Sequence, residues 1–458
     1  MPGLEPYDFV VLGGGLAGLT FAREAARRGR RVAVLESGEQ AGGLARTLVF
    51  DGFRFDLGGH RFHSQLPHVI AWIHELMGGD LLQVSRRSHI FLNNRYVQYP
   101  LQLPNALLAF HPLKAAHILV SYLSAARRHA ANGVADLSFE DWVVNRFGRV
   151  LYEIYFRPYT EKVWGVVCGE LASDFARQRI RVSGLAAAIR GSLWRSAAPS
   201  DSLISRFYYP PLGFGAITDR LVDQTRATGR GEVRLNATIA GLTPPAAEGA
   251  WAVRFGRAGP EETVWGRQVV STIPLDRLLS LLPASAADNP AASLAYRSVI
   301  CVFLALDGPR VGTDTWTYFP DSRLIFGRAH EPANWSPAMV PDGRTSLALE
   351  IFCSVGDDTW RQPDRALIDR CVGDLVGLGL IGAERVRDAW LARAPHAYPI
   401  YRRGYDGVLR RVREHLSRWP TLHLAGRTGS FQYLNADAVI EQALALADTL
   451  MDREAPNW

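Results

Sequence analysis

The feature that most constrains the fold is a glycine pattern near the start of the chain. A short apolar run of strand type, 9–12, leads into Gly13, Gly15 and Gly18, which stand as G-x-G-x-x-G before an alanine-rich helix expected over 17–28. Gly13 permits a tight turn, Gly15 lets the backbone approach a pyrophosphate, and Gly18 lets helix and strand pack closely. The start of such a helix also offers free N–H groups and a partial positive charge to phosphates.

A second predicted strand, 31–35, ends in the acidic residue Glu36. A carboxylate about 20 residues after the glycines accepts ribose hydroxyls in dinucleotide sites. Glycine turns alone are common, but strand, helix, second strand and acid occur here together. The segment therefore predicts a dinucleotide site.

Composition sets the wider limits. At 458 residues, with 48% hydrophobic and 21% charged residues, the chain is expected to form two or three globular domains. It has no run of 18 uncharged apolar residues and enters a strand almost at once, so we expect no transmembrane segment, no signal peptide and a cytoplasmic location. The net charge of +6 comes almost wholly from arginine, since only Lys114 and Lys162 are lysines. The charge suits a small anionic substrate, and no compact nucleic-acid patch is evident.

Metal and redox sites are not expected. Cys168, Cys301, Cys353 and Cys371 are spread too widely for a zinc or C-x-x-C motif, so we interpret them as buried thiols. His60 and His63 could suggest a metal pair, but no further ligand cluster supports it.

Two later segments identify the dinucleotide by resemblance: G-G-L-A-R at 42–46 and D-L-G-G-H at 56–60. They resemble the FAD-binding domain of the amine oxidase, protoporphyrinogen oxidase and UDP-galactopyranose mutase superfamily. The resemblance implies FAD rather than NAD. It implies as cofactor-binding residues Gly13, Gly15, Gly18, Glu36, Gly43, Arg46, Gly58, Gly59, Gly426, Arg427 and Asn435.

The expected fold class is α/β, with a Rossmann-like FAD-binding domain of the glutathione-reductase type. We assign 1–60, 205–290 and 418–458 to that domain, 61–204 to a mainly helical substrate domain, and 291–417 to an antiparallel substrate-covering sheet. Helices are expected over 67–77, 104–131, 139–157, 216–228, 363–378 and 436–451; strands are expected around 85–98, within 233–270 and 297–352, and at 422–425.

Further segments resemble the UDP-galactopyranose mutase branch. His60 follows the Gly-Gly pair, where the resemblance implies a histidine close to flavin N5. Tyr99-Pro-Leu101-Gln102 resembles the uracil-holding Y-P-F-Q, although Leu101 replaces the stacking phenylalanine. On the residues alone, a plain loop is an equally good interpretation of that segment.

Phosphate contacts are implied by the same resemblance. The family motif R-P-Y-T-E-K-V-W-G stands at 157–165. After it, the resemblance implies Arg179 as the residue that binds the nucleotide diphosphate, with Arg177 and Arg181 as alternatives. W-T-Y-F-P at 316–320 and the later G-R imply Trp316, Tyr318 and Arg328, and the C-terminal motifs imply Tyr398 and Tyr433. The chain departs from the family after Asn435, where A-D-A-V replaces Q-D-H-S.

Three functions remain open on the sequence. The first is a nucleotide-sugar mutase that interconverts pyranose and furanose forms, in which reduced FAD supplies N5 as the nucleophile and a reductant such as NAD(P)H keeps the flavin reduced; His60, Arg179 and Arg328 would be its catalytic residues. The second is an FAD-dependent oxidoreductase of the protoporphyrinogen oxidase or carotenoid desaturase kind, for which we expect an apolar funnel. The third is an FAD-binding protein without catalysis.

Overall fold

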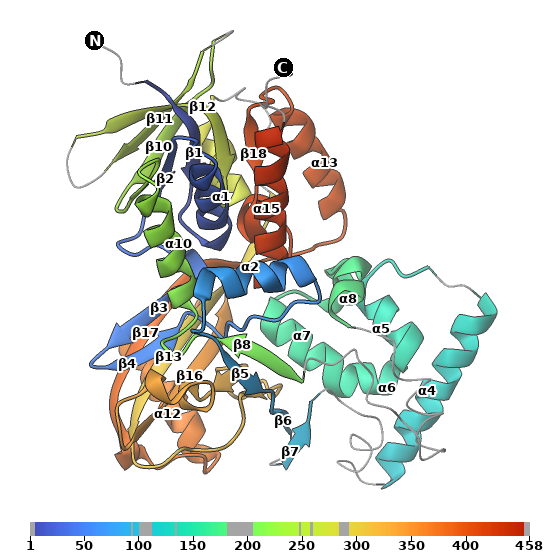
Figure 1. Ribbon diagram of the computed structural model, residues 1–458. Helices are drawn as coiled ribbons and strands as arrows, with labels where there is room; N and C mark the ends of the chain where they lie inside the picture. The colour runs from blue at the N-terminus through green and yellow to red at the C-terminus, as the bar shows by residue number, and fades with distance from the viewer. Residues whose placement is uncertain are drawn as a thin grey trace.

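The computed structural model describes residues 5–92, 95–99, 112–132, 135–180, 205–246, 249–256, 260–283 and 293–452. In Figure 1 a first sheet with its helices lies at one end, near both ends of the chain. A second sheet lies at the opposite end, and a group of helices stands to one side. The observed α/β architecture confirms the expected fold class, whereas the division into three domains stays a prediction.

The first sheet is built around the glycine-rich segment. Its strand order is β10-β11-β12-β1-β2-β9, and β18 also pairs with β12. Strands β1, β2, β9, β18 and the end of β12 run parallel, while β10, β11 and the start of β12 form an antiparallel meander. The bounds are β1 (Tyr7–Leu12), β2 (Val32–Leu35), β9 (Gly231–Arg234), β10 (Thr238–Thr243), β11 (Trp251–Gly256), β12 (Glu262–Ser271) and β18 (Leu422–Leu424).

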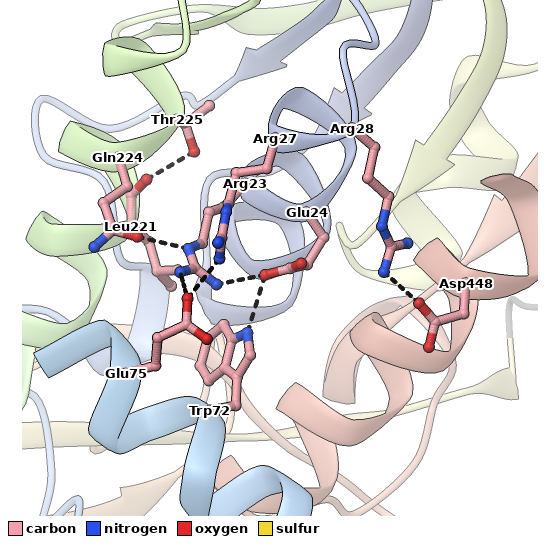
Figure 2. Close-up of polar contacts among 10 residues, drawn as sticks. All are labelled: Arg23, Glu24, Arg27, Arg28, Trp72, Glu75, Leu221, Gln224, Thr225 and Asp448. Carbon is pink, nitrogen blue, oxygen red and sulfur yellow. Dashed lines mark hydrogen bonds and ion pairs between the residues drawn. The ribbon is translucent and has the colours of Figure 1, made fainter.

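Helix α1 (Leu16–Arg27) is almost wholly buried and packs against α10 (Gly215–Ala227) and α15 (Ala436–Asp452). Buried Arg23 on α1 donates to Glu24, to Glu75 of α2 (Pro67–Met77) and to Gln224 of α10 (Figure 2). Arg28 pairs with Asp448 of α15 at 2.5 Å. These contacts connect α1 with the three helices α2, α10 and α15. Because the Arg23 guanidinium has three oxygen partners, its burial is compensated.

The second sheet has the order β17-β13-β16-β15-β14-β6-β7. Its centre is apolar: β13 is buried along its whole length except for its last residue. The bounds are β6 (Ser88–Leu92), β7 (Arg95–Gln98), β13 (Tyr296–Asp307), β14 (Trp316–Tyr318), β15 (Arg328–His330), β16 (Arg344–Cys353) and β17 (Val386–Pro399). Two small antiparallel pairs are separate from these sheets, β3 (Thr47–Phe50) with β4 (Phe53–Asp56) and β5 (Leu82–Ser85) with β8 (Arg206–Tyr209).

The helical group lies beside the second sheet in Figure 1. It contains α4 (Pro112–Asn132), α5 (Phe139–Phe147), α6 (Arg149–Leu151), a π-helical turn (Tyr152–Phe156), α7 (Arg157–Trp164) and α8 (Ser173–Arg179). Ser138 caps α5 through a capping box with Asp141. The expected single helix over 139–157 is wrong, because Gly148 adopts φ +80° and ends α5.

Other predicted elements agree with the structure to within a few residues. The expected helix 67–77 is α2, 363–378 is α12 (Asp364–Gly377), and 436–451 is α15. The helix expected at 104–131 is described from Pro112 onward, and its first residues lie outside the described chain. Strand β17 and helix α13 (Tyr405–Leu416) were not predicted.

Candidate active site

The first part of the site is the turn from β1 into α1. Gly13 has φ +99°, in the left-handed region that glycine tolerates. A Cβ on Gly18 would lie 2.2 Å from the Gly13 carbonyl oxygen, so only glycine allows this close packing. Helix α1 begins after Gly15 without a side-chain cap, and a Cβ on Gly15 would meet no atom nearer than 4.0 Å. The turn therefore presents open space and unpaired N–H groups, the arrangement that suits a pyrophosphate.

Glu36, at the end of β2, is hydrogen-bonded to this turn. Its carboxylate accepts hydrogen bonds from the backbone N–H groups of Gly14 and Gly38, each at 2.8 Å. A carboxylate has about four lone-pair positions, so capacity remains for ribose hydroxyls.

Arg46 adds a cation to this region. Its guanidinium donates to the Gly43 carbonyl at 3.0 Å and pairs with no carboxylate of the described chain. Burial lowers the pKa of Arg46, and the charge of the nearby Glu36 acts in the opposite direction. These residues fit the diphosphate dinucleotide that the sequence predicts.

The segment 58–60 leads from this cradle to the second sheet. His60 Nδ1 lies 3.2 Å from the Gly58 carbonyl oxygen, so Nδ1 carries the hydrogen and Nε2 is an acceptor. Burial, together with the charge of Arg427, lowers the pKa of His60 to about 4. The ring is therefore neutral at physiological pH. Gly59 is required by Trp316, because a Cβ there would lie 1.5 Å from the indole ring.

The centre of the site is a row of opposed residues on three adjacent strands. Tyr318 of β14 is paired in register with Arg328 of β15, and Arg328 is paired with Glu350 of β16. Directly opposed residues project from the same face of a sheet, so their side chains meet. Arg328 Nη1 donates to Glu350 Oε2 at 3.1 Å, and only 8% and 2% of the two side chains are exposed. Glu350 Oε1 also accepts from the Gly59 N–H at 3.1 Å, which connects the row to segment 58–60.

Tyrosine hydroxyls surround the guanidinium of Arg328. Its Nε donates to the hydroxyl of Tyr159, on α7, at 3.1 Å, and Nη1 donates to the hydroxyl of Tyr398 at 3.3 Å. Burial acts to lower the pKa of Arg328, but the acidic neighbours Tyr159, Tyr398 and Glu350 outweigh burial and raise it well above its usual value. Arg328 is thus permanently charged, and its charge is compensated by Glu350.

The C-terminal motifs join the same site. Tyr398 and Tyr433 stack with ring centroids 5.6 Å apart, and the Arg427 guanidinium lies 5.3 Å and 5.4 Å from their centroids. Arg427 also donates to the carbonyls of Ala397 and Leu434, so it links the end of β17 to the loop before α15. Asn435 is exposed, and its carbonyl accepts the first hydrogen bond of α15, from Val439.

The remaining predicted residues separate into two groups. Tyr99 packs on Tyr318 at 4.7 Å and so lies beside the row. Trp316 is buried in a stack with His330 and Trp335, 5.4 Å and 5.9 Å away, and forms the wall behind Gly59. Leu101, Gln102 and Arg181 lie outside the described residues, and so does the side chain of Arg179, whose backbone ends α8.

Sequence reasoning missed several members of the site. Glu350 is the one acid within the apolar strand sequence T-S-L-A-L-E-I-F-C, which was a usable signal. Tyr159 belongs to the R-P-Y motif, and Tyr155 lies in the π-helical turn close to Tyr99, Tyr159 and Tyr318. Such turns are frequent at functional sites.

Lys162 has a structural position. Its ammonium donates to three backbone carbonyls, those of Phe319 at 2.9 Å, Asp321 at 2.7 Å and Phe326 at 2.7 Å. Burial lowers the pKa of Lys162 to about 8, and all three N–H donors are used by the loop between β14 and β15.

The expectations on thiols and metals can also be compared with the structure. All four cysteines are free and buried, as expected. In the part of the chain that the structure describes, no group of three metal-ligating side chains is found. No helix among these residues has the length and apolar character needed to cross a membrane.

Comparison with known proteins gives structural neighbours over the whole chain. A crystal structure of reduced UDP-galactopyranose mutase matches with a TM-score of 0.83 and 22% identity, covering 98% of this chain and 96% of that one. A putative protoporphyrinogen oxidase from Exiguobacterium matches with a TM-score of 0.75 and 17% identity, covering 99% and 100%. At these identities the matches show the fold.

Curated relatives match shorter segments. A carotenoid 3,4-desaturase from Haloarcula japonica is 26% identical over 241 residues, 49% of this chain and 48% of the relative. A probable UDP-galactopyranose mutase from Klebsiella pneumoniae is 22% identical over 174 residues, 37% of this chain and 44% of the relative. The chain thus covers less than half the length of each of these relatives.

The family itself is matched along nearly the full sequence. Residues 16–451 match the family described as flavin containing amine oxidoreductase. This range includes the segments 42–46 and 56–60 and the row on β14, β15 and β16. The chain therefore belongs to the flavin-containing amine oxidoreductase family, and its cofactor is FAD.

Proposed function

We propose that this protein is an FAD-dependent nucleotide-sugar mutase of the UDP-galactopyranose type, which interconverts the pyranose and furanose forms of its substrate. The observation that carries the proposal is the polar row Tyr318–Arg328–Glu350, with the hydroxyls of Tyr159 and Tyr398 on the same guanidinium. Guanidinium and phenol donors suit a diphosphate. A hydrocarbon substrate would call for an apolar funnel at this position.

The FAD would be held by the cradle on β1 and α1. Its pyrophosphate would lie against the start of α1 and near Arg46, and Glu36 would accept from the ribose. When bound and reduced, the flavin supplies the nucleophile for the anomeric carbon of the sugar. An external reductant such as NAD(P)H would be needed to keep it reduced. The start of α15, after Asn435, would stabilise negative charge on the reduced ring.

His60 would act as a neutral acceptor beside the flavin. Its Nδ1–H is used by the Gly58 carbonyl, so Nε2 is the atom that can hold a proton shared with a donor in the site. Because the pKa of His60 is lowered to about 4, this ring adds no positive charge that would compete for the diphosphate.

The protein's other task would be to orient the sugar diphosphate and to stabilise it as it leaves. Arg328 would do so with hydrogen-bond donors fixed in advance by Glu350 and the tyrosines, so little reorganisation is needed during reaction. Tyr398 and Tyr433 would add hydroxyl donors, and Arg179 stays a predicted contact of the diphosphate.

The alternative is an FAD-dependent oxidoreductase. The matches to a desaturase and to a putative protoporphyrinogen oxidase support this alternative, and membership of the family is compatible with it. Two features argue against the amine oxidase form in particular. Lys162 is engaged by three backbone carbonyls, and the other lysine, Lys114, lies near the start of α4.

The test is an incubation of the purified flavoprotein with UDP-galactofuranose, with the flavin either oxidised or reduced by dithionite, followed by chromatography. Conversion to UDP-galactopyranose with reduced flavin alone is the expected result. Tyr398→Phe, which removes one donor to the substrate and keeps the ring stack, should lower the rate without loss of FAD. If neither flavin state converts the substrate and UDP does not perturb the flavin spectrum, the mutase proposal is wrong and the oxidoreductase becomes the first candidate.

A further inference from the structure

Arg61, directly after His60, is a partly buried cation that pairs with no carboxylate among the described residues. Its guanidinium lies 5.9 Å from the ring of Phe207, and no carboxylate of the described chain lies within ion-pair distance of it. Burial lowers the pKa of Arg61, and the titratable groups near enough to affect it are Tyr318, Arg86, Tyr99 and Arg328. No carboxylate is among them. A cation held this way is costly unless an anion comes to pair it.

Arg23, Arg297 and Arg328 are buried, and each is compensated within the protein. Arg23 pairs with Glu24 and Glu75, and Arg328 pairs with Glu350. Arg297 donates to the carbonyls of Val163, Lys162 and Phe352 and to Ser354 Oγ. Arg61 is different because its planar fork of donors is directed to none of these partner types within the described residues.

A second cation lies nearby. The Arg86 guanidinium stands over the Tyr99 ring at 5.2 Å from its centroid, and Nε donates to Ser88 Oγ at 3.1 Å. The Tyr99 ring packs on Tyr318, whose strand holds the central row. Arg61 and Arg86 are therefore close enough for their like charges to act on each other, near Tyr99 and Tyr318.

This distribution of charge bears on which groups attract the substrate. Arg328 contributes donors, but Glu350 cancels its charge at 3.1 Å. Arg61 and Arg86 lie next to the row, and within the described residues neither of them pairs with a carboxylate. We propose that Arg61 and Arg86 bind the phosphate groups of the substrate and provide the preference for a diphosphate over an uncharged nucleoside or sugar. This inference rests on the proposed function, because it takes the substrate to be a nucleoside diphosphate sugar.

The test compares Arg61→Met, Arg61→Lys and Arg86→Met with Arg87→Met. Arg87 is the matched control, since it adjoins Arg86 in sequence and its side chain is exposed. Binding of UDP, inorganic pyrophosphate and uridine to the holoprotein is measured by titration calorimetry at two salt concentrations. FAD content and the visible spectrum report folding.

Arg61→Met is expected to weaken UDP and pyrophosphate binding by about tenfold to a hundredfold, the range for losing a charge-assisted hydrogen bond, with uridine unchanged. Arg61→Lys should recover part of the loss, because it keeps the charge and loses the fork. Arg86→Met should weaken the binding of both UDP and pyrophosphate and should reduce the salt dependence of that binding. If Arg61→Met fails to retain FAD, Arg86→Met is the variant that tests the proposal. Arg87→Met should bind as the unaltered protein does.

The outcomes separate this inference from the proposed function. Pyrophosphate binding that depends on Arg61, without conversion of UDP-galactofuranose, supports the anion site and removes the mutase. Conversion with unaltered UDP affinity in both Arg61→Met and Arg86→Met keeps the mutase and overturns the anion site. Absence of pyrophosphate binding by the unaltered protein also overturns it.

Discussion

Arg328 and Glu350 allow stability and function to be separated. At an effective dielectric constant of about 20, unit charges 3.1 Å apart attract by about 5 kcal/mol. Removing one partner of a buried pair costs about 3–5 kcal/mol, because the other charge stays buried alone. We therefore expect Arg328→Met and Glu350→Gln each to lower the free energy of unfolding by roughly this amount. The double variant should lose about 2–3 kcal/mol less than the sum of the two.

The assay is guanidinium unfolding of the holoprotein, followed by flavin fluorescence and by far-UV circular dichroism, with the free energy taken where the two transitions coincide. The exposed pair Arg365 and Asp369 is the control, since its two side chains are largely in solvent and its coupling should be much smaller. UDP binding and turnover are measured on the same variants. Arg328→Met should retain FAD and lose both UDP binding and turnover. The double variant should be more stable than the sum of the two single losses predicts, but it should still have no turnover. Additive losses in the double variant would refute the argument from burial, and full turnover in Arg328→Met would refute the role of Arg328.

Three further predictions follow from single contacts. Gly18→Ala should abolish FAD retention, because its Cβ would lie 2.2 Å from the Gly13 carbonyl oxygen. The control is Gly373→Ala on α12, where an added Cβ meets no atom within 4 Å and FAD retention should not change. Both are measured as the flavin content after purification. Since the pKa of His60 is about 4, kcat/KM should show no inflection from it between pH 5.5 and 8, and an inflection near 6.5 that disappears in His60→Asn would contradict this. Burial raises the pKa of Asp56 to about 6, so its stabilising contribution is present below the unfolded value of 3.8 and is lost as the pH rises through 6. The free energy of unfolding of the unaltered protein should therefore fall by about 1 kcal/mol between pH 5 and 7, and that of Asp56→Asn should not show this loss. Urea unfolding measures both, and an equal pH dependence of the two free energies would contradict the prediction.

The local parts of the fold could be predicted from the sequence. Gly13, Gly15, Gly18 and Glu36 act through backbone contacts within one β-α-β unit, so their spacing is enough. Helix α2 could be predicted from its Pro67 start and amphipathic pattern, and its observed bounds are the expected ones.

Strand β17 could not be predicted in the same way. It carries several charges and Pro395, which are unusual in a strand. The structure explains their tolerance: β17 is the edge strand of its sheet, and its pairing with β13 shifts register between Arg297 and Val299. An edge position leaves room for proline and for solvated charges. A single sequence does not reveal which strand lies at an edge.

The site was predictable by residue type more than by arrangement. Arg328 and Tyr318 were expected from their motifs, but their alignment with Glu350 depends on the registers of β14, β15 and β16, which are set by long-range pairing. Glu350 stands in an apolar strand, where a buried acid needs a partner, but the sequence does not show which residue that partner is. Arg61 carries no sequence signal of its own, because its neighbours Arg86, Tyr99 and Tyr318 come from other segments of the chain.

The central claim is that reduced FAD acts here as a catalyst that is not consumed. The most direct measurement is the number of turnovers per flavin under anaerobic conditions, with the enzyme reduced once, excess reductant removed, UDP-galactofuranose added, and the flavin absorbance recorded with product formation. The account predicts many molecules of UDP-galactopyranose per flavin while the spectrum stays that of reduced flavin. Product formation that stops at one equivalent, or flavin oxidation in proportion to product, would contradict it and assign net redox chemistry to this site.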